Sequence, residues 1–65
     1  MTRDEIAEIE TYAAERVADF DRAGWTRAEI VRPYRVPSGD PAAIRLRAEI
    51  ERYAEFAETG IDPDR

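Results

Sequence analysis

The chain of 65 residues contains neither cysteine nor histidine. Without cysteine there is no disulfide, and there is no thiolate to act as a nucleophile or to bind a metal. Without histidine the commonest general base and the commonest metal ligand are missing. We therefore expect no metal, no cofactor, no small-molecule substrate and no enzymatic activity.

Other absences exclude further classes of protein. Glycine occurs only at three scattered positions, so no glycine-rich loop can hold a phosphate. Ser38 is the only serine, and no histidine or lysine is present to activate it. No apolar run is long enough to cross a membrane, and the acidic N-terminus lacks the apolar stretch of a signal peptide. We expect a soluble, cytoplasmic protein.

Charge is sorted along the chain into three blocks. Residues 1–21 carry seven acids against two arginines, residues 22–48 carry six arginines against two acids, and residues 49–65 carry six acids against two arginines. The net charges are therefore −5, +4 and −4, within a total of −5. Such a layout offers a basic centre to an acidic partner, while the acidic arms repel nucleic acid or bind a basic partner.

Capping signals mark where three helices begin. The pattern Thr-Arg-x-Glu-Ile occurs twice, beginning at Thr2 and at Thr26, and each copy has the spacing of a capping box. Asp40 followed by Pro41 is a third start, with an acidic cap and a proline at the first helical position.

The ends of these helices are marked by residues that stop a helix. Gly24 and Gly60 suit the left-handed conformation that follows a last turn, and Pro33 ends or kinks a short middle helix. Together the signals predict helices over residues 3–23, 27–32 and 41–58.

The expected fold is an all-α mini-domain of three helices. Two long amphipathic helices pack antiparallel, and a short helix and a proline-rich turn join them. The domain covers residues 1–61, and residues 62–65 form a frayed tail. The predicted core consists of Ile6, Ile9, Val17, Phe20, Trp25, Ile30, Val31, Val36, Leu46, Ile50, Tyr53 and Ile61. On the last helix Arg45, Glu49, Arg52 and Glu55 are expected to face away from it.

A core of this size leaves a monomer marginally stable. Tyr12, Ile44 and Phe56 fall outside the apolar stripes of the predicted helices. If these three side chains lie on one side of the molecule, they form a surface for self-association or for a partner. We therefore expect a homodimer or an obligate protein partner.

The favoured function is docking on a macromolecular partner without catalysis. Small acidic helical proteins of this kind act as inhibitors, antitoxins or adaptors; some are phage-encoded, and some imitate nucleic acid. The residues predicted to bind the partner are Glu8, Glu15 and Asp19 on an acidic helix face, with Trp25, Arg32, Tyr34 and Arg35 around the bend.

Two alternatives stay open. In the first, residues 26–47 form a helix-turn-helix-like unit that binds DNA through Arg27, Arg45 and Arg47. The long connection and the net charge of −5 weigh against it. In the second, the blocks neutralise one another within the chain: Arg45 and Arg47 pair with Glu49 and Glu51, and Arg22 with Asp19.

Overall fold

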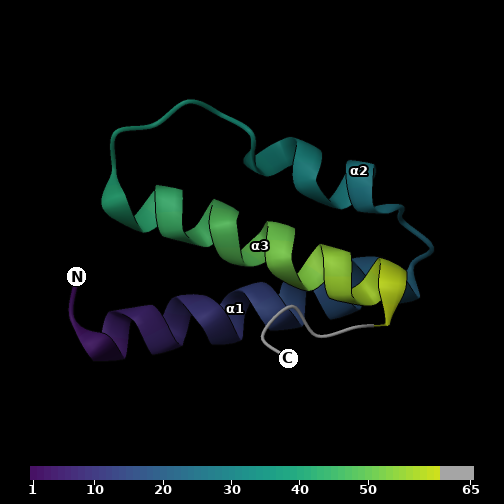
Figure 1. The fold of residues 1–65 in the computed structure, drawn as a ribbon, viewed down its shortest axis with the longest axis horizontal. Coiled ribbons are helices and arrows are strands. Elements are labelled where there is room, and N and C mark those ends of the chain that lie inside the picture. The colour runs from purple at the N-terminus through teal and green to yellow at the C-terminus, as the bar shows by residue number, and fades with distance from the viewer. Residues whose placement is uncertain (61–65) are drawn as a thin grey trace.

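A computed structural model describes residues 1–60, and within them the chain is helical with no strand (Figure 1). Helix α1 spans Arg3–Arg22, α2 spans Arg27–Val31, the 3-10 helix η1 spans Arg32–Tyr34, and α3 spans Pro41–Thr59. The expected all-α fold with two long helices and a short one is confirmed. The predictions for Ile61 and for the tail at residues 62–65 lie outside the described residues.

The helices begin at the predicted caps. At Thr26 both bonds of the capping box form: the hydroxyl accepts from the Glu29 N–H at 3.3 Å, and the Glu29 carboxylate accepts from the Thr26 N–H at 3.0 Å. Hydrogen bonding to the Thr26 backbone, and then to its hydroxyl, lowers the pKa of Glu29. At Thr2 the hydroxyl accepts from the Glu5 N–H, and the Asp40 carboxylate accepts from the Ala42 N–H.

The helices end close to glycine and proline residues, as the sequence predicts. Gly24 and Gly60 have φ of 87° and 75°, the left-handed conformation that glycine adopts without strain. Helix α2 ends at Val31, one residue earlier than predicted, and the chain continues through Pro33 as a 3-10 turn. Proline is tolerated there because the first amides of a helical turn need no partner within it.

The two long helices run parallel, so the predicted antiparallel packing was wrong. Figure 1 shows α1 and α3 pointing the same way, with the start of each helix at the same end of the molecule. The contacts agree, because Glu10 on α1 bonds Arg45 near the start of α3, and Asp21 and Ala57 line one hollow near the other end.

The two long helices are parallel because the connection between them is long. The short helix α2, the 3-10 turn and the loop at residues 35–40 together span about 30 Å when each is counted at its usual rise per residue. Helix α3, with 19 residues, is about as long. The connection therefore returns along the whole length of α3 before α3 begins, giving an up-down-up order.

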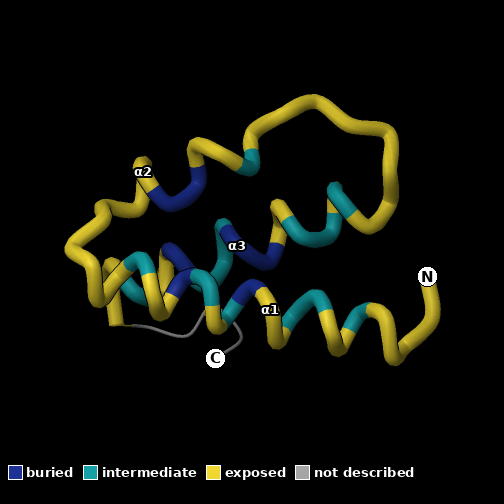
Figure 2. The backbone as a smooth tube through the Cα atoms, turned by 180° about the vertical axis from the view of Figure 1, so that it is seen from behind, coloured by how far each residue is buried: buried dark blue, intermediate teal, exposed yellow. Residues whose placement is uncertain are grey.

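The core lies where the three helices meet (Figure 2). Its buried members are Ala13, Val17, Ile30, Val31, Ile50 and Ala54, and Phe20, Tyr34, Leu46, Tyr53 and Ala57 pack against them. Four of the predicted core residues lie outside this cluster: Ile6 and Ile9 are only half-buried, and Val36 and Trp25 are exposed. Val36 is 67% exposed because the loop at residues 35–40 arches away from α3, and Trp25 is 39% exposed because it stacks on the flank of Phe20.

Truncating Ile50 tests the location of the core. Ile50 is fully buried, so Ile50→Ala removes transfer energy and leaves a cavity, and we expect a loss of about 2–5 kcal/mol in unfolding free energy. Phe56→Ala, a larger truncation at an exposed position of the same helix, is expected to cost about 1 kcal/mol or less. Urea unfolding followed by circular dichroism measures both. Equal losses would contradict this core.

Candidate docking surface

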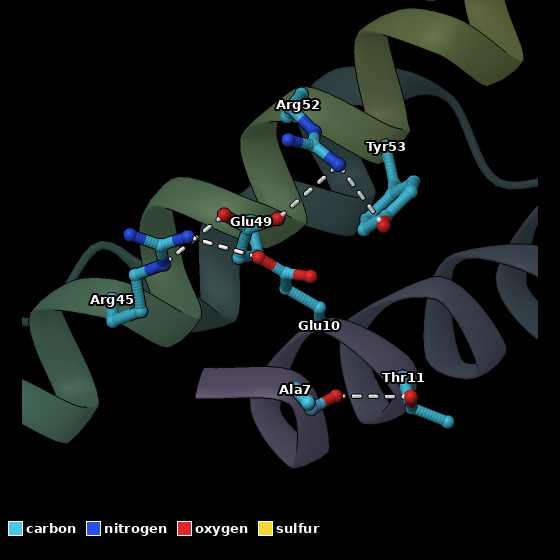
Figure 3. A network of polar contacts seen from close by, with 7 residues as sticks. All are labelled: Ala7, Glu10, Thr11, Arg45, Glu49, Arg52 and Tyr53. Atoms are coloured by element: carbon cyan, nitrogen blue, oxygen red, sulfur yellow. Dashed lines mark hydrogen bonds and ion pairs between the residues drawn. The ribbon is translucent and has the colours of Figure 1, made fainter. Parts of the chain in front are cut away.

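A polar network joins α1 to α3 (Figure 3). At its centre is Glu49, which is 5% exposed although the apolar pattern predicted that it would face away from the core. Its carboxylate lies 3.2 Å from the Arg45 Nε and 3.6 Å from an Arg52 nitrogen. Arg45 also donates to Glu10 on α1 at 3.0 Å, and Arg52 donates to the Tyr53 hydroxyl at 3.1 Å.

Glu49 is buried because α1 covers it. The apolar stripe of α3 taken alone would leave it exposed. Glu49 lies about 40° from Tyr53 around α3, at the edge of the apolar stripe. The small side chains Ala13 and Ala14 follow Glu10 on α1 and allow that helix to come close at this level. A buried carboxylate is costly unless it is paired, and two arginines from its own helix supply the pairing.

Most arginines of the basic centre contact acids within the chain. The pairs among the described residues are Arg22 with Asp19, Arg27 with Glu58 at 3.9 Å, Arg35 with Glu51 at 4.0 Å, Arg45 with Glu10 and Glu49, and Arg47 with Glu51 at 3.4 Å. Within residues 1–60 only Arg32 of this block has no ion pair. Exposed pairs add little stability, but they neutralise the charge that the sequence presents as a block.

The acids on the exposed face of α1 are mostly without such an ion-pair partner in the part of the chain that the structure describes. Glu8, Glu15 and Asp19 are all exposed, and at 100° per residue they lie within about 40° of one another on the helix. Asp19 pairs with Arg22, whereas Glu8 and Glu15 form no ion pair with any described residue. Between these two acids the Tyr12 side chain is 48% exposed, and all three line one shallow hollow along α1.

A second hollow, of about 370 Å³, lies between α1 and the start of α3. Its apolar part includes Ile9 and Leu46, which α2 leaves half-covered because it packs nearer the other end of α3. Its charged lining residues are Glu8 and Asp40, both acidic. The two hollows share Glu8 and Tyr12, so they form one surface, which we call the acidic groove.

The residues predicted at the bend do not gather into one patch. Trp25 stacks on Phe20 with ring centroids 4.4 Å apart. Tyr34 follows α2 in the chain, whereas Trp25 precedes it, and the Tyr34 side chain is half-buried against the core. Arg32 and Arg35 are exposed next to Tyr34.

Arg16 connects part of this region to α1. Its guanidinium lies 4.8 Å from the centre of the Phe20 ring. The polar contact with Tyr34 raises the pKa of Arg16, and the Tyr12 hydroxyl and the Asp19 carboxylate act in the same direction more weakly. Arg16 is therefore firmly cationic and lies beside the acidic face without forming an ion pair with Glu8 or Glu15.

The alternative set of nucleic-acid contacts is dispersed. Arg27 lies beside Glu58, Arg47 pairs with Glu51, and Arg45 is held between α1 and Glu49. Sequence reasoning missed Glu10. It predicted the pair of Arg45 with Glu49 but placed Glu49 on the solvent side, and it named Tyr12 as a possible partner surface without placing it beside Glu8 and Glu15. The one signal for Glu49 was its spacing, four residues after Arg45 and three before Arg52, which places both guanidinium groups within reach of its carboxylate.

Among the described residues no group of three or more acidic, histidine or cysteine side chains is placed to hold a metal ion. In the same part of the chain no helix is both long and apolar enough to cross a membrane. The chain matches no protein-family model, no curated protein and no solved structure.

Removing the Glu49 carboxylate tests the network. Glu49→Ala leaves Arg45 and Arg52 without their shared partner, and because both arginines are partly exposed we expect a loss of about 1–3 kcal/mol. Glu55→Ala, on the exposed side of the same helix, is expected to change stability by less than about 0.5 kcal/mol. Urea unfolding compares the two variants. If Glu49→Ala were as stable as Glu55→Ala, the network would have no role in stability.

Proposed function

We propose that the chain is a small non-catalytic docking protein that binds a basic surface of a partner protein through the acidic groove, as an inhibitor, antitoxin or adaptor does. The observation that supports this most is the unequal pairing of charge. Five of the six central arginines contact an acid of the same chain, whereas Glu8 and Glu15 contact no cation within residues 1–60. Charges without an internal partner attract an oppositely charged one.

The groove also favours a partner with an apolar side chain among its cations. Ile9 and Leu46 are half-covered, and Tyr12 is half-exposed at the same place. Burial of an apolar group gives affinity, and the acidic rim selects cationic neighbours for it. A basic amphipathic helix, with a leucine between lysines or arginines, has this chemistry.

Binding of DNA through a helix-turn-helix-like unit has less support. Arg45, which was to contact DNA, is only half-exposed and bonds Glu10 and Glu49. Releasing it would leave the buried Glu49 with one partner fewer. The acids of α1 oppose the gain from counterion release that drives DNA affinity.

Fluorescence anisotropy with two labelled helical peptides tests the proposal. One peptide combines lysine with a leucine stripe, and the other has alanine for leucine at equal charge. We expect the leucine peptide to bind with a Kd in the micromolar range and the alanine peptide to bind at least about fivefold more weakly. Raising the salt from about 50 to 200 mM is expected to weaken both.

Charge reversal locates the binding surface. In Glu8→Lys/Glu15→Lys we expect affinity to fall about tenfold or more, because cations then face cations. The control Asp21→Lys/Glu55→Lys makes the same change in net charge at other exposed positions. Equal losses in the two variants would contradict binding at the acidic groove. Micromolar binding of duplex DNA that weakens steeply with salt would favour the alternative.

A further inference from the structure

Two exposed aliphatic side chains border another hollow, which adjoins the acidic groove at Ala43. Val36 is 67% exposed in the loop that arches over the start of α3, and Ile44 is 55% exposed on that helix. Both line a hollow of about 220 Å³, with Ala48 among its walls. An apolar space of about 150 Å³ already accommodates a benzene-sized group, so this hollow has room for one aliphatic side chain.

The charges at this hollow differ from those of the acidic groove. Its charged lining residues are Arg47 and Glu51, which pair at 3.4 Å, and Arg35 approaches the same glutamate at 4.0 Å. The rim thus carries both signs, with one arginine in excess. Two α1 faces repel each other because both are acidic, whereas two such rims each carry both signs, so an acid of one copy can lie opposite an arginine of the other.

The small core gives a physical reason to cover this face. Among the described residues the buried hydrophobic side chains number six, two of them are alanines, and Ile30 and Ile50 are the largest that are fully buried. Domains of this size often gain stability by oligomerisation because one core is too small.

We propose that the chain forms a homodimer with twofold symmetry in which the hollow bordered by Val36 and Ile44 faces the same hollow of a second copy. Each copy then offers both projecting aliphatic side chains and a space to receive them, which is the self-complementarity that a twofold interface requires. The other exposed apolar side chains do not share this hollow. Tyr12 lies in the acidic groove, and Phe56 does not line the hollow. The proposal does not rest on the docking function, because neither Glu8 nor Glu15 lines this hollow.

Sedimentation equilibrium tests the proposal over a range of concentration. We expect the wild-type mass to rise from 7.5 kDa towards twice that value between about 5 and 500 µM, with a melting temperature that rises over the same range. Ile44→Glu places a carboxylate in the contact and is expected to stay monomeric throughout. Phe56→Glu makes the same change at another exposed site on α3 and is expected to dimerise as the wild type does.

The outcomes are decisive because both substituted positions are exposed, and circular dichroism establishes that each variant is folded. A wild type that stays monomeric up to about 500 µM would overturn the proposal. So would an Ile44→Glu variant that still dimerises, or a Phe56→Glu variant that dissociates equally. Val36→Glu, on the loop side of the hollow, provides a second variant for which loss of the dimer is expected.

Discussion

The direction in which the chain returns from α1 to α3 is the constraint on which the rest of the structure depends. Because the connection runs back along the molecule, α3 starts beside the start of α1 and runs parallel to it. This places Glu10 opposite Arg45 at 3.0 Å. It also places Ile9 beside Leu46, where the cover of α2 has ended. An antiparallel pair would bring neither contact about.

The distribution of charge on the surface follows in part from this arrangement. With α3 parallel to α1, Glu10 meets Arg45, and α2 lies where Arg27 meets Glu58. The pairs of Arg22 with Asp19 and of Arg47 with Glu51 lie within single helices and do not depend on helix direction. The apparent acid–base–acid layout is therefore largely neutralised in space. What remains is an excess of acid on α1, beside a half-covered apolar hollow. We regard this excess as the main clue to function that the chain offers.

Features that depend on neighbouring residues could be predicted from the sequence, and features that depend on distant ones could not. The caps at Thr26 and Asp40 and the stop at Gly60 each require only a few adjacent residues, and they are where the sequence places them. The exposure of Glu8 and Glu15 follows from one helical stripe. The direction of α3 could not be predicted in this way, because the same turn residues suit either a sharp reversal of the chain or a long return. Glu49 was placed on the solvent side for the same reason, since its burial depends on which helix lies beside it.

The parallel alignment can be measured directly because the chain contains no cysteine. Two doubly spin-labelled variants suffice, Glu5→Cys with Ala42→Cys and Glu5→Cys with Glu58→Cys, all at exposed helical positions. Pulsed electron–electron double resonance gives the distance between the two spin labels in each variant. The parallel arrangement predicts that residue 5 is nearer to residue 42, by about 20 Å from the rise of α3 between the two sites. A shorter distance from residue 5 to residue 58 would show antiparallel helices and contradict the account.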